Sequence, residues 1–296
     1  MLTPEQVETY HRDGYLVISG VLRGEKLAEL RRATDEIVEG ARAVSVNDDL
    51  YDLEPSHTPR VPRVRRLKPA IFERYPFFRD LVGDPAIVEL VAQLVGPDVR
   101  LYGGKLNMKS AGHGSPVEWH QDWAFYPHTN DDVLATGIYL DDCGPDNGPL
   151  LVLPGSHAGP TFDHHAEGRF CGALDVVANG IDVSKAVALT GEAGSMTIHH
   201  ARLIHGSALN VSSRQRRLLL HEYAAADAWP LMGVGDFEAF EGKMLRGKSG
   251  NQPRIVPAPV RMPLPSPLHR GSIYESQRVV GGRSFETYED HARRAG

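Results

Sequence analysis

From about residue 99 onward, short apolar runs alternate with turn-forming residues, and this rhythm restricts the possible folds more than any other feature of the sequence. The runs include VRLYGGKLNMKS, VLATGIYLDD, GPLLVLPGSH and RRLLLHEYAAA. Many short strands separated by turns are typical of an all-β barrel or a two-sheet sandwich. We therefore expect a mainly β protein with flanking α-helices, whose β core spans about residues 99–225.

Helical patterns lie mostly before this core. Residues 3–12 begin with Thr3, a candidate N-cap, and residues 85–96 begin with proline and end with glycine. Residues 23–41 repeat apolar side chains at helical spacing, whereas residues 14–22 have the character of a strand that ends at a turn. We expect the N-terminal helices to pack on one sheet of the core.

Two further segments carry no regular pattern. Residues 42–70 contain prolines and acidic residues, and because long loops in compact domains are often functional, we expect them to form a lid. Residues 227–296 are rich in proline and are expected to wrap around the core as irregular structure. No repeat or linker divides the sequence, so residues 1–296 are expected to form a single domain.

Charge and composition restrict the partners of the chain. The net charge is −6 and 24% of the residues are charged, which is typical of a globular protein and argues against a nucleic-acid-binding surface. The basic run RVPRVRR at 60–66 is interpreted as a solvated loop, with contact to an anionic substrate as the alternative.

The cellular location is also restricted by the sequence. The two cysteines lack zinc-binding spacing, and a reducing, cytoplasmic compartment fits them. The N-terminus lacks a signal-peptide pattern, and no apolar run reaches the roughly 18–20 residues of a membrane span. The sequence does not indicate the oligomeric state.

The stretch EWHQDWAF at 118–125 places His120 and Asp122 two residues apart. Residues i and i+2 of a strand share a face, so this pair forms either an exposed polar surface or two ligands of one metal ion. Non-haem Fe(II) oxygenases use two histidines and one carboxylate, which leaves open positions for O₂ and a co-substrate. Downstream, HHARLIHGSALNVSSRQRR offers His205 in a strand-like run, followed by arginines at the start of the next strand.

Three motifs occur in a fixed order: WHQD at 119–122, NGPLLVLPGSH at 147–157 and HGSALNVSSRQR at 205–216. With the opening segment Tyr10–Tyr15, they resemble the phytanoyl-CoA dioxygenase family of Fe(II)/2-oxoglutarate oxygenases. The resemblance covers roughly residues 3–225, and three ordered motifs are far more specific than a lone HxD. It implies a double-stranded β-helix, that is, a jelly-roll or cupin-like core.

The resemblance implies that His120, Asp122 and His205 bind Fe(II), and that Arg216 pairs with the distal carboxylate of 2-oxoglutarate. Arginine suits that role because its planar fork meets a carboxylate through two parallel charge-assisted hydrogen bonds. Three further residues are implied as co-substrate contacts: Asn107, Lys109 and Ser207. The presence of Asp122, rather than glycine or alanine, favours hydroxylation or a related oxidation over halogenation.

The implied reaction uses O₂ and 2-oxoglutarate, releases succinate and CO₂, and hydroxylates an unactivated C–H bond of a small-molecule substrate. Two alternatives from other classes stay open: a barrel that binds metal and 2-oxoglutarate without turnover, and a zinc-dependent hydrolase. The sequence does not indicate the substrate. Three arginines are candidates for recognising an acidic one, with ordinary surface charge as the default: Arg63, Arg66 and Arg246.

Neighbouring polar residues receive other interpretations. His199 and His200 are expected in the core or behind the ligands, and the NGPLLVLPGSH segment is expected to shape the fold without taking part in chemistry. Arg217 must point away if Arg216 points inward, and the paired acids Asp141 and Asp142 are interpreted as solvated. Three side chains would line the pocket mouth if the strand breaks after the WHQD motif: Trp123, Tyr126 and His128.

Overall fold

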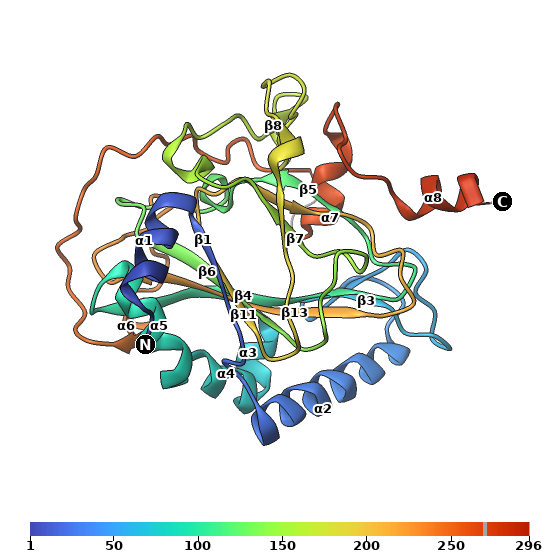
Figure 1. Cartoon of the computed structure of the whole chain (residues 1–296), viewed down its shortest axis with the longest axis horizontal. Helices are drawn as coiled ribbons and strands as arrows, with labels where there is room; N and C mark the ends of the chain where they lie inside the picture. The colour runs from blue at the N-terminus through green and yellow to red at the C-terminus, as the bar shows by residue number, and fades with distance from the viewer. Residues whose placement is uncertain (269–270, 296) are drawn as a thin grey trace.

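Two antiparallel sheets face each other at the centre of the molecule, for which a computed structural model describes residues 1–268 and 271–295 (Figure 1). The larger sheet has the strand order β1-β11-β6-β13-β4-β3-β2, and β14 also pairs with β4. The smaller sheet has the order β10-β7-β12-β5. This arrangement confirms the expected mainly β, jelly-roll core.

The strands are short, as the sequence rhythm predicts. The larger sheet contains β1 (Tyr15–Ile18), β2 (Tyr51–Leu53), β3 (Val64–Leu67), β4 (Val99–Lys109), β6 (Val133–Tyr139), β11 (Met196–His200), β13 (Arg216–Ala225) and β14 (Met244–Arg246). The smaller sheet contains β5 (Val117–His120), β7 (Leu150–Val152), β10 (Val187–Leu189) and β12 (His205–Ser207). A separate hairpin is formed by β8 (His165–Ala166) and β9 (Arg169–Phe170).

The N-terminal helices lie against the larger sheet, with α2 to α5 on its side away from the smaller sheet (Figure 1). The N-terminal helices are α1 (Pro4–Asp13), α2 (Gly24–Gly40), α3 (Ala70–Arg74), α4 (Pro76–Val82) and α5 (Pro85–Val95). The predicted cap is confirmed, because the Thr3 side chain accepts a hydrogen bond from the backbone of Gln6, whose own side chain accepts from the backbone of Thr3. Burial of Leu30, Phe78 and Ile87 joins these helices to the core.

The expectation of a loop over residues 42–70 was partly wrong. Residues Tyr51–Leu53 and Val64–Leu67 pair as β2 and β3 and extend the larger sheet. The buried carboxylate of Asp52 makes this possible, because it accepts hydrogen bonds from Arg65 at 2.8 Å and from Arg66 at 3.0 Å. Two arginines of the basic run therefore share one buried carboxylate inside the fold, and the interpretation of this run as a solvated loop was wrong for them.

Strand β13 fixes which side chains face the inside of the molecule. It lies between β4 and β6, and it sets Arg216 opposite Lys109 and Leu218 opposite Asn107. Arg217 points the other way, as expected. It binds Asp141 and also Asp35 of α2, so the expectation of a solvated side chain was wrong for Asp141, whereas Asp142 is exposed as expected.

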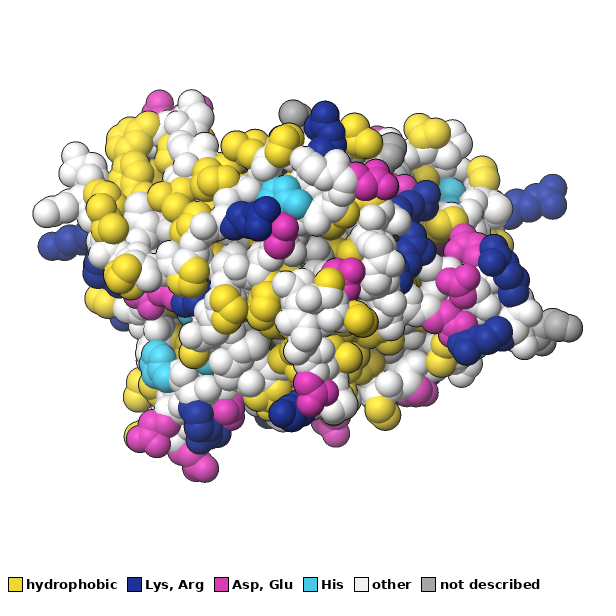
Figure 2. Space-filling view, turned by 90° about the horizontal axis from the view of Figure 1, so that it is seen from above, with side chains coloured by type: hydrophobic (Ala, Val, Ile, Leu, Met, Phe, Trp, Pro, Cys, Tyr) yellow, Lys and Arg dark blue, Asp and Glu magenta, His cyan; other side chains and the backbone are white. Residues whose placement is uncertain are grey.

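The C-terminal residues run along one side of the molecule and over the smaller sheet to the C-terminus (Figure 1). This tail contains α6 (Phe237–Glu241), β14, α7 (Ile273–Ser276) and α8 (Tyr288–Ala295), so it is less irregular than its proline content suggests. Figure 2 shows a face on which basic and acidic side chains are interspersed. Among the helices of the described residues, none has the length and apolarity that crossing a membrane requires.

The turn before β11 gives a test of this fold. Gly194 has φ +84°, and a Cβ there would lie 2.0 Å from the carbonyl oxygen of Leu22, whereas Gly180 has φ +62° and open space around it. Gly180→Ala should cost about 1–2 kcal/mol from the left-handed backbone alone. Gly194→Ala should cost roughly 1–3 kcal/mol more, because the added methyl group collides with backbone. Urea unfolding of both variants measures the difference, and equal losses would contradict this packing.

Candidate active site

The two histidines of the predicted metal site are direct neighbours across two strands. His120 is the last residue of β5, and His205 on β12 is its partner in the antiparallel register. Their ring centroids lie 4.1 Å apart. The pairing of β5 with β12 therefore brings together residues that are far apart in the sequence.

Asp122 reaches the same point by a different route from the one expected. The strand ends at His120, and a short 3₁₀ helix, η2 (Asp122–Ala124), follows, so Asp122 does not share a strand face with His120. The turn is held in place because the backbone N–H of Trp123 donates to the carbonyl of Ala201 at 2.8 Å. The spacing in the motif is right, but the geometry that uses it is a turn.

The three side chains have the donor set of an iron site. Ligand atoms of His120, Asp122 and His205 all lie within 4.8 Å of one another. Nδ1 of His120 donates to the carbonyl of Glu118 at 2.8 Å, and Nδ1 of His205 donates to the carbonyl of Leu203 at 2.9 Å. Because a carbonyl only accepts, both protons lie on Nδ1, and both Nε2 lone pairs are free for a metal. Two imidazoles and a carboxylate fit Fe(II).

Burial sets the protonation of this cluster. It lowers the pKa of His120 and lowers the pKa of His205 well below its usual range, so both rings are neutral near pH 7. Burial alone would raise the pKa of Asp122, but contacts with His205, His199 and Lys105 hold that pKa well below the usual range. The carboxylate is therefore ionised, and all three groups are in the form that binds a cation.

His199 lies behind the carboxylate, which fits its interpretation as a supporting residue. It projects from β11, is almost completely buried, and has Nε2 3.4 Å from Oδ2 of Asp122. Its ring centroid lies 4.6 Å from that of His205. The side chain thus limits the orientations that the carboxylate can adopt.

A cavity of about 1050 Å³ lies between the two sheets, and the three candidate ligands are on its wall. Much of the wall is apolar, including Phe125, Ala135, Leu150, Phe170, Leu218 and Leu220. Six buried polar atoms of wall residues have no hydrogen-bond partner within residues 1–268 and 271–295: Arg66 Nε, Asn107 Oδ1, the Tyr126 hydroxyl, both ring nitrogens of His199 and Arg216 Nη1. Buried polar groups are normally satisfied, so these atoms indicate that the cavity holds a polar ligand.

Arg216 is held so that one edge of its guanidinium remains available. Its Nε and Nη2 donate to the carbonyl of Gly148 at 3.0 and 2.7 Å, while Nη1 is the unpaired atom. This geometry fits the carboxylate of 2-oxoglutarate. The NGPLLVLPGSH segment therefore does more than shape the fold, because its Gly148 carbonyl orients this arginine.

The other implied co-substrate contacts have different outcomes. Asn107 and Ser207 both line the cavity, Asn107 from the larger sheet that carries Arg216 and Ser207 from the smaller sheet. Lys109 turns away and donates to the carbonyls of Ser115 at 2.5 Å and Ala208 at 2.7 Å. Its position gives no support to the implied co-substrate contact.

Of the side chains expected at the pocket mouth, Tyr126 lines the cavity and the other two do not appear among its described lining residues. Trp123 is fully buried and donates from Nε1 to the carbonyl of Pro259. His128 is buried beside Tyr102. The break in the strand after the motif thus brings one of the three into the cavity.

Sequence reasoning missed an ion pair inside the cavity. Lys105 on β4 lies with Nζ 2.8 Å from Oε1 of Glu222 on β13, and both line the cavity. The alternation of strand residues was a usable signal: Lys105 precedes Asn107 by two residues, and Glu222 shares the face of Arg216.

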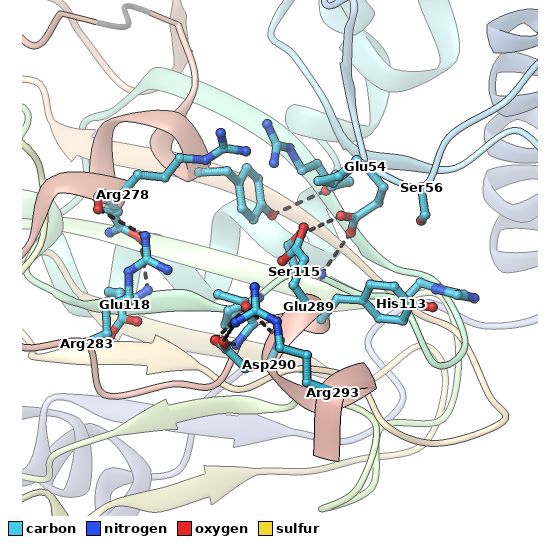
Figure 3. A pocket seen from close by; sticks show the side chains of 17 residues that line it. Glu54, Ser56, His113, Ser115, Glu118, Arg278, Arg283, Glu289, Asp290 and Arg293 are labelled. Carbon is cyan, nitrogen blue, oxygen red and sulfur yellow. Dashed lines mark hydrogen bonds and ion pairs between the residues drawn. The ribbon is translucent and has the colours of Figure 1, made fainter. Parts of the chain in front are cut away.

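A second, smaller cavity of about 340 Å³ lies where the tail packs beside β5 (Figure 3). In it, Glu54 accepts from the backbone N–H of Ser115 at 2.9 Å, and Glu118 accepts from the backbone N–H of Ser284 at 2.9 Å. Its charged groups fasten the tail to the core. The backbone carbonyl of Glu118 also accepts the hydrogen bond from His120 Nδ1. The contact between Glu118 and the C-terminal tail therefore helps to position a candidate metal ligand.

Comparison with known proteins agrees with this geometry. Residues 10–218 match the family model described as phytanoyl-CoA dioxygenase (PhyH). The chain is 38% identical over 281 residues to a probable alpha-ketoglutarate-dependent hypophosphite dioxygenase of Stutzerimonas stutzeri, covering 93% of this chain and 97% of that protein. It is 32% identical over 244 residues to an L-proline trans-4-hydroxylase of Streptomyces griseoviridis, covering 72% and 83%.

Solved structures share the fold. EctD from S. alaskensis with bound Fe has a TM-score of 0.65 at 22% identity, and EctD with 2-oxoglutarate and 5-hydroxyectoine has a TM-score of 0.64 at 22% identity. Each comparison covers 89% of both chains. At this identity the likeness establishes the jelly-roll fold.

The fold, the His–Asp–His cluster and the relatives define an Fe(II)- and 2-oxoglutarate-dependent dioxygenase. The chain belongs to the phytanoyl-CoA dioxygenase family, as the sequence motifs predict.

Arg216 provides a test of the co-substrate end of the cavity. Arg216→Met should raise the KM for 2-oxoglutarate about 10- to 100-fold, because a charge-assisted hydrogen-bond contact worth about 1.5–3 kcal/mol is lost. Arg216→Lys should recover part of that loss. Arg214→Met removes an exposed arginine that pairs with Asp146 and serves as the control. An unchanged KM in a folded Arg216→Met protein would remove Arg216 from this role.

Proposed function

We propose that this dioxygenase hydroxylates a small oxyanion, with hypophosphite as the leading candidate. The observation that carries the proposal is the cationic group Lys105, which lies inside the cavity beside the candidate iron ligands. The match to the probable hypophosphite dioxygenase covers 93% of this chain, whereas the match to the proline hydroxylase covers 72% of it.

In this proposal, bound iron supplies the activation of O₂. His120, Asp122 and His205 hold the metal, with both imidazoles fixed by their Nδ1 hydrogen bonds. Arg216 holds the distal carboxylate of 2-oxoglutarate, and Asn107 and Ser207 contact the same molecule. The apolar wall keeps water away from the reacting centre.

The reaction balances with the substrates named. One oxygen atom of O₂ converts a P–H bond of hypophosphite into P–OH, which gives phosphite. The other oxygen atom enters succinate as 2-oxoglutarate loses CO₂. A zinc hydrolase needs no 2-oxo acid and leaves the unpaired Nη1 of Arg216 without a purpose.

The lid and tail segments complete this proposal. Cavity-lining residues come from 42–70, including Asp49, Arg66 and Lys68, and from 227–296, including Met232 and Lys243. The two segments are joined, because Arg65 binds Glu275 at 2.6 Å. We propose that they form the entrance for the substrate, and that residues 1–296 act as one domain.

A second candidate is hydroxylation of a C–H bond in a zwitterionic amino acid. The Lys105–Glu222 pair favours it, since the two side chains offer one partner for a carboxylate and one for an ammonium group. The L-proline hydroxylase among the relatives has such a substrate.

Product analysis separates the candidates. Purified protein with Fe(II), 2-oxoglutarate and air should convert hypophosphite to phosphite, with an equal amount of succinate, and L-proline should give little succinate above background. Phosphorus NMR detects the phosphite. His120→Ala should abolish both products because a metal ligand is lost. Hydroxyproline as the main product, with hypophosphite inert, would overturn the oxyanion proposal in favour of the second candidate.

A further inference from the structure

The Lys105–Glu222 pair is built into the wall of the cavity rather than added at its surface. Nζ of Lys105 lies 2.8 Å from Oε1 of Glu222, and the Glu222 side chain is only 9% exposed. A Cβ at Gly103 would lie 2.9 Å from Oε2 of Glu222, so the absence of a side chain there makes room for the carboxylate. The strand thus accommodates a buried negative charge next to the reaction centre.

Lys105 keeps its positive charge in this position. Burial by itself would lower its pKa, but Glu222 and Asp122 outweigh that effect and raise the pKa above its usual value. An ammonium group has three N–H donors, and one of them goes to Glu222. Because Lys105 lines the cavity, its other N–H donors are available to a ligand there.

Tyr126 adds a neutral donor at the same place. Its hydroxyl is buried and has no hydrogen-bond partner in the described part of the chain. A phenol ordinarily titrates at about pH 10, so near neutral pH this hydroxyl carries its proton and can donate to an oxygen of a bound ligand.

We propose that Lys105, Tyr126 and Glu222 form a charge-selective subsite that binds one singly charged oxyanion beside the iron ligands. Lys105 and Tyr126 donate hydrogen bonds to the oxyanion, and Glu222 repels a second negative charge. The inference rests on the proposed function and specifies how the cavity selects its substrate.

The charges of Lys105 and Glu222 allow the subsite to distinguish the substrate from the product. Lys105 and Glu222 together carry no net charge, so they do not attract the second negative charge of a doubly charged anion. A negative charge close to the Glu222 carboxylate is strongly unfavourable. Hypophosphite carries one charge, whereas phosphite ionises a second time near neutral pH. The subsite therefore accepts the substrate, releases the product and excludes sulfate.

The basic residues at the cavity entrance have a different role. Arg66 is held by Asp52 and by the carbonyl of Gly271, and Lys68 donates to the carbonyl of Asp48. These cations attract anions of any charge from solution. Selection between one and two negative charges falls to Glu222.

Anion binding tests the subsite directly. The Fe(II)- and 2-oxoglutarate-loaded protein is titrated calorimetrically without O₂, at mildly alkaline pH, with hypophosphite, formate, phosphite and sulfate. The wild-type protein should bind hypophosphite and formate about tenfold or more tightly than phosphite and sulfate. Glu222→Gln should tighten phosphite about tenfold or more and remove the preference, because the repelling charge is gone. Lys105→Met should weaken all four anions by a similar factor, and Lys105→Arg should restore part of the binding.

Matched controls are available at the surface. Lys185→Met and Glu25→Gln remove exposed charges, since those side chains are both 79% exposed, and both should bind the anions as the wild type does. In steady-state assays, inhibition by phosphite should increase with pH more steeply in Glu222→Gln than in the wild type.

The test also separates failure of this inference from failure of the proposed function. Anion binding that ranks as described supports the subsite even when hypophosphite is not turned over, which would overturn the proposed function alone. A wild-type preference that survives Glu222→Gln, or unchanged binding in Lys105→Met, would overturn the subsite. So would tight binding of L-proline that depends on Glu222, since the pair would then recognise a zwitterion.

Discussion

The site depends on the antiparallel pairing of two very short strands, β5 and β12. That pairing sets His205 opposite His120, and the carbonyls of Leu203 and Glu118 then fix the two rings in the same tautomer. Strands of three and four residues have little stability alone, so they depend on their neighbours. One neighbour is β7, and another is the tail, where the side chain of Gln277 accepts from the backbone N–H of Glu118. Backbone hydrogen bonds thus set the positions of the two histidine donor atoms.

The clustering of the three candidate metal ligands and the position of Arg216 on the same cavity could be predicted because their chemistry restricts residue type and spacing. Asp122 shows the limit of that inference: the motif identifies the residue, but only the structure shows that a turn delivers its carboxylate. Lys109 shows a second limit, since a residue at a family position can direct its ammonium group to backbone carbonyls instead of a ligand. Motif spacing identifies side chains that bind the same metal ion. It says less about side chains such as Lys109, whose orientation depends on the residues packed around them.

The positions of buried charged side chains are the main feature that could not be predicted from the sequence. A charged residue in a strand is ordinarily assigned to solvent, and that assumption fails when a partner lies far away along the chain. Arg65 is buried because of Asp52, and Arg217 because of Asp141 and Asp35. The same holds for Lys105 and Glu222, which are 117 residues apart. Desolvating any one of these groups alone is costly, so each position is intelligible only once its partner is known.

Strand β13 explains how one cavity serves two ligands. Arg216 and Glu222 lie on the same face of this strand, six residues or about 20 Å apart along it, with Leu218 and Leu220 between them. The end with Arg216 suits a diacid co-substrate, and the end with Glu222 belongs to the proposed anion subsite. The intervening leucines are apolar and part of the cavity wall, and the polar side chains of Asn107 and Lys105 on β4 lie opposite them. Because one strand carries both ends, a substitution at Glu222 changes the partner of Lys105 and leaves the two bonds from Arg216 to the Gly148 carbonyl in place.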